Sequence, residues 1–119
     1  MYTLYFSLPV EMDKEKFAKF AVDAKAILEN SEVQIADESG QVLNGFVVTD
    51  DLINFNGYGS NSHEPCIIKR VDTESKYIKN GFVSNFCKTT EAKPYRNIVI
   101  RILNKLKEHF PEIQIFELH

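Results

Sequence analysis

The stretch SNFCKTTEAKPYRNIVIRIL, residues 84–103, contains the junction that decides the fold prediction. Its first part reads as the end of a β-strand that runs to Cys87 and Lys88. Pro94 then fits the first turn of a helix, where the N–H that proline lacks would have had no partner. A single apolar face continues from there at helical spacing and predicts a helix that ends before Pro111. The residues of this face are Tyr95, Ile98, Val99, Ile102, Leu103, Leu106 and Phe110.

An earlier segment, residues 12–31, predicts a second amphipathic helix. Its apolar residues recur three or four positions apart, with Lys and Asp between them. Asp13 is a plausible N-cap, because an aspartate side chain accepts hydrogen bonds from the first free N–H groups of a helix. The apolar positions are Phe17, Phe20, Ala21, Ala24, Ile27 and Leu28.

The remaining segments read as short strands separated by turns. Alternation of apolar and polar residues predicts strands at 2–8, 33–36, 46–49, 52–55, 66–71, 82–88 and 113–118. Asp50-Asp51 lies between two of them and predicts a tight hairpin. Asn-Gly occurs at residues 44, 56 and 80, and Asn80-Gly81 suits a type I′ turn. Repeated turns of this kind favour antiparallel pairing.

The element order therefore predicts an α+β fold in one domain that spans residues 1–119. We expect a mainly antiparallel sheet of about six strands, with both helices packed on one face as a two-layer sandwich. Two amphipathic helices cannot bury their apolar faces against each other and also cover a large sheet. The other sheet face is expected to be partly solvated or covered by a second copy of the chain, which would make a homo-oligomer.

Composition restricts the possible partners. The chain has 119 residues and a formal charge of −3, with pI near 5.6, which argues against a protein devoted to duplex nucleic acid but leaves room for a small basic pocket. No segment has the length and apolar character of a membrane span, and residues 1–10 do not resemble a signal peptide. We expect a cytoplasmic protein without a membrane partner, in which Cys66 and Cys87 are small buried residues in a reducing compartment.

The start of the second helix is the strongest candidate binding site. A helix N-terminus offers unpaired N–H groups and a partial positive charge, which suit a phosphate, carboxylate or sulfate. Glu91 adds a negative charge there and weakens the prediction, and local capping by threonine is the alternative interpretation. The candidate residues are Lys88, Thr89, Thr90, Lys93, Tyr95 and Arg96.

The polar, glycine-containing segment 56–65 is the second candidate, because loops on rigid scaffolds often carry function. It holds His63 and Glu64, either of which is able to transfer a proton. An exposed loop histidine is the simpler interpretation. We predict no cofactor and no metal, since His63, Cys66 and Cys87 match no ligand spacing and have no evident fourth ligand.

Three functions follow as hypotheses. Binding of single-stranded nucleic acid on the sheet face is the least favoured, because the acidic balance and the lack of a basic stripe count against it, although Tyr and Phe are plentiful enough for stacking. The preferred one is a small non-catalytic domain that binds a small anionic ligand or a protein. The alternative is a small enzyme for a phosphorylated or carboxylated molecule. In that enzyme Lys88, Lys93 and Arg96 would hold the anion, while a proton would move through His63, Glu64 or Tyr95. Whether the chain is an enzyme depends on whether these two segments meet in the fold.

Overall fold

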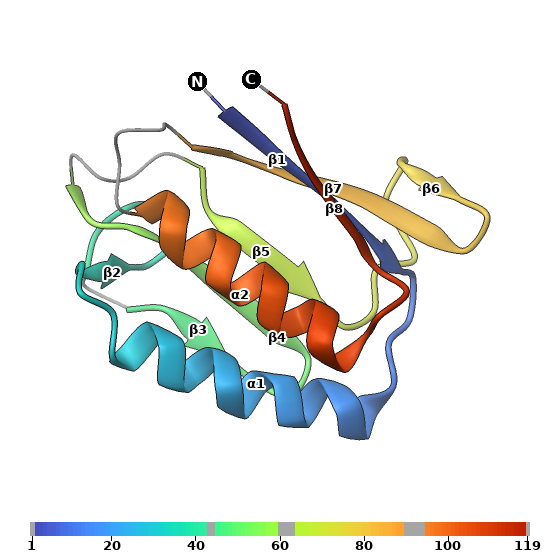
Figure 1. Cartoon of the computed structure of the whole chain (residues 1–119), viewed down its shortest axis with the longest axis horizontal. Helices are drawn as coiled ribbons and strands as arrows, with labels where there is room; N and C mark the ends of the chain where they lie inside the picture. The colour runs from blue at the N-terminus through green and yellow to red at the C-terminus, as the bar shows by residue number, and fades with distance from the viewer. Residues whose placement is uncertain (1, 43–44, 60–63, 90–94, 119) are drawn as a thin grey trace.

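The computed structural model describes residues 2–42, 45–59, 64–89 and 95–118, and leaves the side chains of Tyr2, Lys88, Thr89 and Leu118 outside the description. Within these residues the chain forms two helices and eight strands (Figure 1). In chain order the elements are β1 (Tyr2–Pro9), α1 (Lys14–Glu29), β2 (Ile35–Ala36), β3 (Val47–Val48), β4 (Leu52–Gly57), β5 (Cys66–Lys69), β6 (Ile78–Lys79), β7 (Phe82–Thr89), α2 (Tyr95–His109) and β8 (Gln114–Leu118).

The first and last parts of the chain build the main sheet. Its strand order is β6-β7-β1-β8, and every neighbouring pair is antiparallel. Together with the helices this gives the order β-α-β-β-α-β, which is the split βαβ arrangement of ferredoxin-like folds. The segment between α1 and β6 is an insertion into that arrangement. It forms a second sheet in which β4 pairs with β2, β3 and β5.

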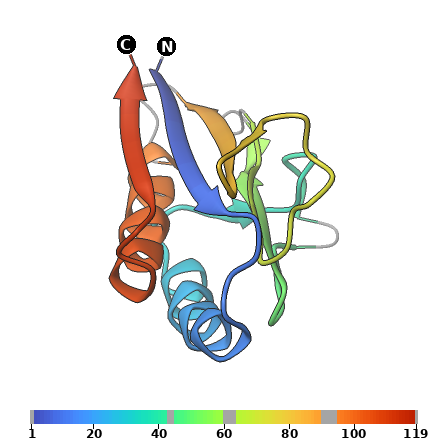
Figure 2. The same ribbon diagram turned by 90° about the vertical axis from the view of Figure 1, so that its right-hand side faces the viewer.

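The strands of the two sheets lie side by side in one curved layer, and both helices lie on the same side of it (Figure 2). The predicted α+β class, antiparallel pairing and two-layer packing are confirmed. The strand count differs from the expected six or so, and the strands divide between two sheets. β2 and β3 lie within the predicted strands 33–36 and 46–49, whereas β6 was not predicted, since a strand of two residues leaves little alternation in the sequence.

One hydrophobic core joins the two sheets and the helices. It contains β1 residues such as Phe6, β4 and β5 residues such as Phe55 and Ile68, and the stripes of both helices. All five buried residues of α1 lie on its predicted apolar face. Asp13 caps this helix as predicted, since its side chain accepts a hydrogen bond of 3.0 Å from the backbone N–H of Lys16.

The predicted turns also form. Asn80 and Gly81 both have positive φ, 55° and 79°, as a type I′ turn requires, and they connect β6 to β7. The hairpin at Asp50-Asp51 connects β3 to β4, and the backbone N–H of Thr49 donates to the carbonyl of Leu52 at 2.8 Å. Neither helix within the described residues has the length and apolar character needed to cross a membrane.

Candidate functional site

Tyr95 connects the start of α2 to the polar loop. It is the first residue of α2 and is fully buried, with its ring 5.9 Å from that of Phe55 in an edge-on contact. Its hydroxyl lies 3.1 Å from the carbonyl oxygen of Glu64 and 3.3 Å from that of Phe55. Its single proton is therefore directed to these two carbonyls. The end of the loop and the start of the helix thus meet, and two of the predicted residues, Tyr95 and Glu64, are in contact.

Two cysteine thiols complete this buried cluster. Cys66 and Cys87 are free and fully buried, and the thiol of Cys87 lies 3.4 Å from the carbonyl oxygen of Glu64. The pKa of the Cys66 thiol is raised well above its ordinary value, first by its hydrogen bond with Cys87 and then by burial. Burial is also the main cause that raises the pKa of Tyr95. Cys66 and Tyr95 therefore remain protonated at neutral pH and hold β5, β7 and α2 together as neutral groups.

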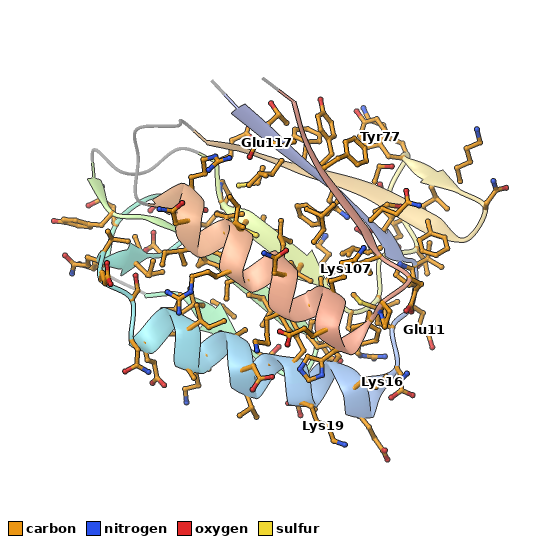
Figure 3. All side chains as sticks on the ribbon, in the orientation of Figure 1. Glu11, Lys16, Lys19, Tyr77, Lys107 and Glu117 are labelled. Carbon is orange, nitrogen blue, oxygen red and sulfur yellow. The ribbon has the colours of Figure 1, made fainter. Side chains whose placement is uncertain are left out.

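Arg96 points to a different part of the fold. Its guanidinium forms an ion pair with the carboxylate of Glu117 on β8, and each side chain is about one-fifth exposed (21 %). Figure 3 labels Glu117 at the end of the chain, close to the start of α2. The positive charge that was assigned to an anion is thus balanced by a carboxylate of the sheet. This pair fixes the start of α2 to β8.

The other predicted anion-site residues lie outside the described part of the structure. His63, Thr90 and Lys93 fall in the segments that are not described, and so do the side chains of Lys88 and Thr89. The anion-binding hypothesis for these residues stays a prediction. Among the described residues, no group of three or more His, Cys, Asp or Glu side chains is placed to hold a metal ion.

The opposite face of the main sheet carries a feature that the sequence analysis missed. We call the side of β6-β7-β1-β8 that is turned away from the helices the outer face. Phe86 on β7 and Phe116 on β8 both lie directly opposite Tyr5 on β1. The ring of Tyr5 is 5.5 Å from that of Phe116 and 6.2 Å from that of Phe86. The three side chains form an aromatic row across three strands, and Phe86 and Phe116 remain about half exposed (48 % and 52 %).

Shallow hollows surround the aromatic row. A hollow of about 390 Å³ lies beside β6 and β7, another of about 270 Å³ lies between β7 and β5, and a third of about 200 Å³ borders Tyr5 and Phe116. Ser84 lines all three, so they are neighbouring parts of one surface. The first contains Lys79 and Glu112, the second contains Lys69 and Asp72, and the third has no charged residue. The charges around the row are therefore balanced.

A signal for the aromatic row was present in the sequence. In β1 the buried residues are Leu4, Phe6 and Leu8, so Tyr5 belongs to the opposite phase, where polar residues are expected. On β7, Phe86 directly precedes the buried Cys87, so it too belongs to the exposed phase of its strand. An aromatic residue at the polar phase of two strands predicts an exposed ring. Only the strand register shows that these rings are neighbours.

Comparison with known proteins gives no relative from which a function could be transferred. The chain matches no protein-family model, and neither a curated protein nor a solved structure shows significant similarity to it. The functional argument therefore rests on the described residues themselves.

Proposed function

We propose that this protein is a small non-catalytic interaction domain and that the outer face of its main sheet binds another protein. The aromatic row of Phe86, Tyr5 and Phe116 carries this proposal. Three large rings occupy the middle of a sheet face, where folding alone leaves two of them about half exposed. Aromatic side chains are enriched at the centres of protein interfaces, where each buries a large apolar area on binding.

The surroundings of the row suit a protein partner. Protein interfaces commonly have an aromatic, charge-poor centre and a polar rim that forms hydrogen bonds. Here the rim has hydroxyl and amide side chains, namely Ser7, Ser84, Asn80 and Gln114. The balanced charges in the hollows disfavour a single-stranded nucleic acid, which would require a basic groove along its phosphates in addition to stacking rings. The expected partner presents an apolar surface bordered by hydrogen-bonding groups.

The described polar groups at the start of α2 favour a binding domain over an enzyme. The buried hydroxyl of Tyr95 is engaged by two carbonyls, the Cys66 thiol is protonated, and Arg96 is paired with Glu117. These described groups stabilise the contact between α2 and the strands. They do not supply a base or a nucleophile at neutral pH.

Site-specific photo-cross-linking tests the proposal. Phe86 is replaced by p-benzoylphenylalanine in the protein produced in its natural cells, and the cells are irradiated. We expect an adduct of discrete mass that is sensitive to protease and resistant to nuclease. The adduct should disappear when Tyr5→Ser is added, because this removes the centre of the row. It should persist when Val22→Ser is added, since Val22 lies 70 % exposed on α1.

Three kinds of result would overturn the proposal. The first is an adduct yield at position 86 that equals the yield from the same photoreactive residue at Val22. The second is an adduct that contains nucleic acid, or salt-dependent binding of a thymidine 12-mer to the purified protein. The third is retention of the adduct in the Tyr5→Ser protein, which would show that the aromatic row is not the contact.

The enzyme remains a second candidate, because the loop that bears Glu64 does reach the helix start at Tyr95. We propose Lys88 and Lys93 as its anion ligands. Calorimetric titration with inorganic phosphate tests this, with Lys88→Ala and Lys93→Ala as variants. Each variant should bind phosphate several-fold more weakly while its stability changes by less than roughly 0.5 kcal/mol. Equal phosphate affinity in wild type and variants, or none in the wild type at millimolar phosphate, would exclude the site.

A further inference from the structure

We infer that two copies of this chain associate through their β8 strands and form a continuous eight-stranded sheet around a two-fold axis. This inference concerns the edge of the main sheet and goes beyond the binding role of its outer face. β8 is the outermost strand of that sheet, paired with β1 alone among the described residues. An edge strand offers backbone N–H and C=O groups to any strand that approaches it.

The register shows which backbone groups point outward. Successive residues of a strand direct their backbone groups to opposite sides. The N–H of Ser84 donates to the carbonyl of Tyr77 at 3.1 Å, so Ser84 faces the β6 side and Asn85 faces β1. Asn85 lies opposite Phe6, so Phe6 faces β7 and its neighbour Tyr5 faces β8.

The same alternation continues into β8. Tyr5 lies opposite Phe116, so the backbone of Phe116 faces β1, whereas the N–H and C=O of Ile115 face away from the sheet. At the beginning of the strand Lys107 Nζ donates to the carbonyl of Ile113 at 2.9 Å. Lys107 therefore covers the outward edge of β8 at Ile113 and not farther along the strand. The outward edge of Ile115 lies beyond it.

Natural sheets commonly protect such an edge with lysine, proline, a bulge or an inward-pointing charge. Residues 114–118, QIFEL, contain neither lysine nor proline. The pairing with β1 runs without a bulge from Ser7↔Gln114 to Thr3↔Leu118. The one charged residue, Glu117, is balanced by Arg96 of the same chain. Among the described residues, Lys107 protects this edge at Ile113, and the outward backbone groups of Ile115 lie beyond that protection.

Phe116 favours a second copy as the occupant of this edge. It is the middle residue of β8, and its backbone faces β1, so in a symmetric antiparallel pair it would lie opposite Phe116 of the second copy at a non-hydrogen-bonded position. Side chains are closest at such positions. The two aromatic rows would then join end to end, and the second copy would cover part of the exposed surface of Phe116.

Sedimentation equilibrium of the purified chain, with two matched variants, tests the inference. We expect the mass to rise with concentration from 13.7 kDa toward twice that value. Phe116→Lys should remain monomeric at every concentration, because two lysines would face each other at the axis. Phe86→Lys is the matched control, since Phe86 is similarly exposed in the same row but lies away from β8. It should dimerise like the wild type.

A cysteine at the axis tests the register independently. Phe116→Cys should form an intermolecular disulfide under mild oxidation with oxidised glutathione, whereas Gln114→Cys should not, because position 114 would face position 118 of the other copy. A monomer at millimolar concentration, a Phe116→Lys dimer, loss of the dimer in Phe86→Lys, or equal cross-linking at positions 114 and 116 would each overturn the inference. The photo-cross-link from position 86 does not depend on these outcomes.

Discussion

At the scale of single residues, Tyr95 shows how a polar group becomes part of the core. Its ring fills the apolar stripe of α2, and its hydroxyl serves the carbonyls of Glu64 and Phe55. A buried carbonyl without a donor is costly, so the hydroxyl stabilises the loop end as well as the helix. The sequence placed Tyr95 on the apolar face of α2 and also named it as a candidate binding residue. In the structure the whole side chain, including the hydroxyl, is buried.

We predict that Tyr95→Phe lowers the free energy of unfolding at pH 7 by about 1–2 kcal/mol, the usual cost of removing one partner of a buried hydrogen bond. Urea denaturation measures this change. Tyr77→Phe is the control, since Tyr77 is 54 % exposed, and it should alter stability by less than about 0.5 kcal/mol. Equal effects of the two substitutions would contradict the assigned role of the hydroxyl.

The same substitution should change the dependence of stability on pH. Burial raises the pKa of Tyr95 in the folded state, so the unfolded chain loses this proton first, near its ordinary value of about 10. The stabilisation is complete below that pH and is lost as the pH rises beyond it, at up to about 1.4 kcal/mol per pH unit. The stability difference between wild type and Tyr95→Phe should therefore shrink above pH 10. A constant difference from pH 7 to pH 11 would contradict this.

At the scale of elements, α2 shows how far local patterns determine structure. Its apolar positions are spaced to form one stripe, and all six residues buried within the helix belong to the predicted face. The helix ends before Pro111, as this proline predicts. Pro94, which was predicted in the first turn, lies outside the described residues. Lys107 and His109 in its last turn complement the helix dipole.

We predict that Ile102→Ala lowers the free energy of unfolding by about 2–5 kcal/mol, because Ile102 is fully buried in the middle of α2 and its removal leaves a cavity. Asn104→Ala, on the exposed side of the same helix, should change stability by less than about 0.5 kcal/mol. Thermal or urea unfolding of both proteins measures the contrast. A loss below 1 kcal/mol for Ile102→Ala would contradict the assigned face.

At the scale of the whole molecule, the strands were predictable but their partners were not. Alternation and turns indicated the strands at 2–8, 52–55 and 82–88, and adjacent strands joined by short turns were predicted to pair. The pairing of β1 with both β7 and β8 joins segments about 80 and 110 residues apart, and no local signal encodes it. Because β1 pairs with β7 and β8, these strands form a sheet that is separate from the one built around β4.

For the candidate site, too, the sequence indicated the residues but not their contacts. Residue type and position near predicted turns were sufficient to indicate Tyr95, Arg96 and Glu64 as candidate site residues. The sequence could not show that Arg96 would pair with Glu117, or that Tyr95 would donate to the loop, since both contacts depend on tertiary packing. The aromatic row was missed because its three members come from three separate strands.

The residue pattern alone determined the two helices, most strands, the turn at Asn80-Gly81 and the α+β class, because each depends on neighbours within a few positions of the chain. Only the tertiary structure decided the main-sheet order, the exposed aromatic row and the open edge at β8. These features arise where distant segments meet. The free energy of burying a shared core, rather than any local preference, selects which strands become neighbours and which edge remains unpaired.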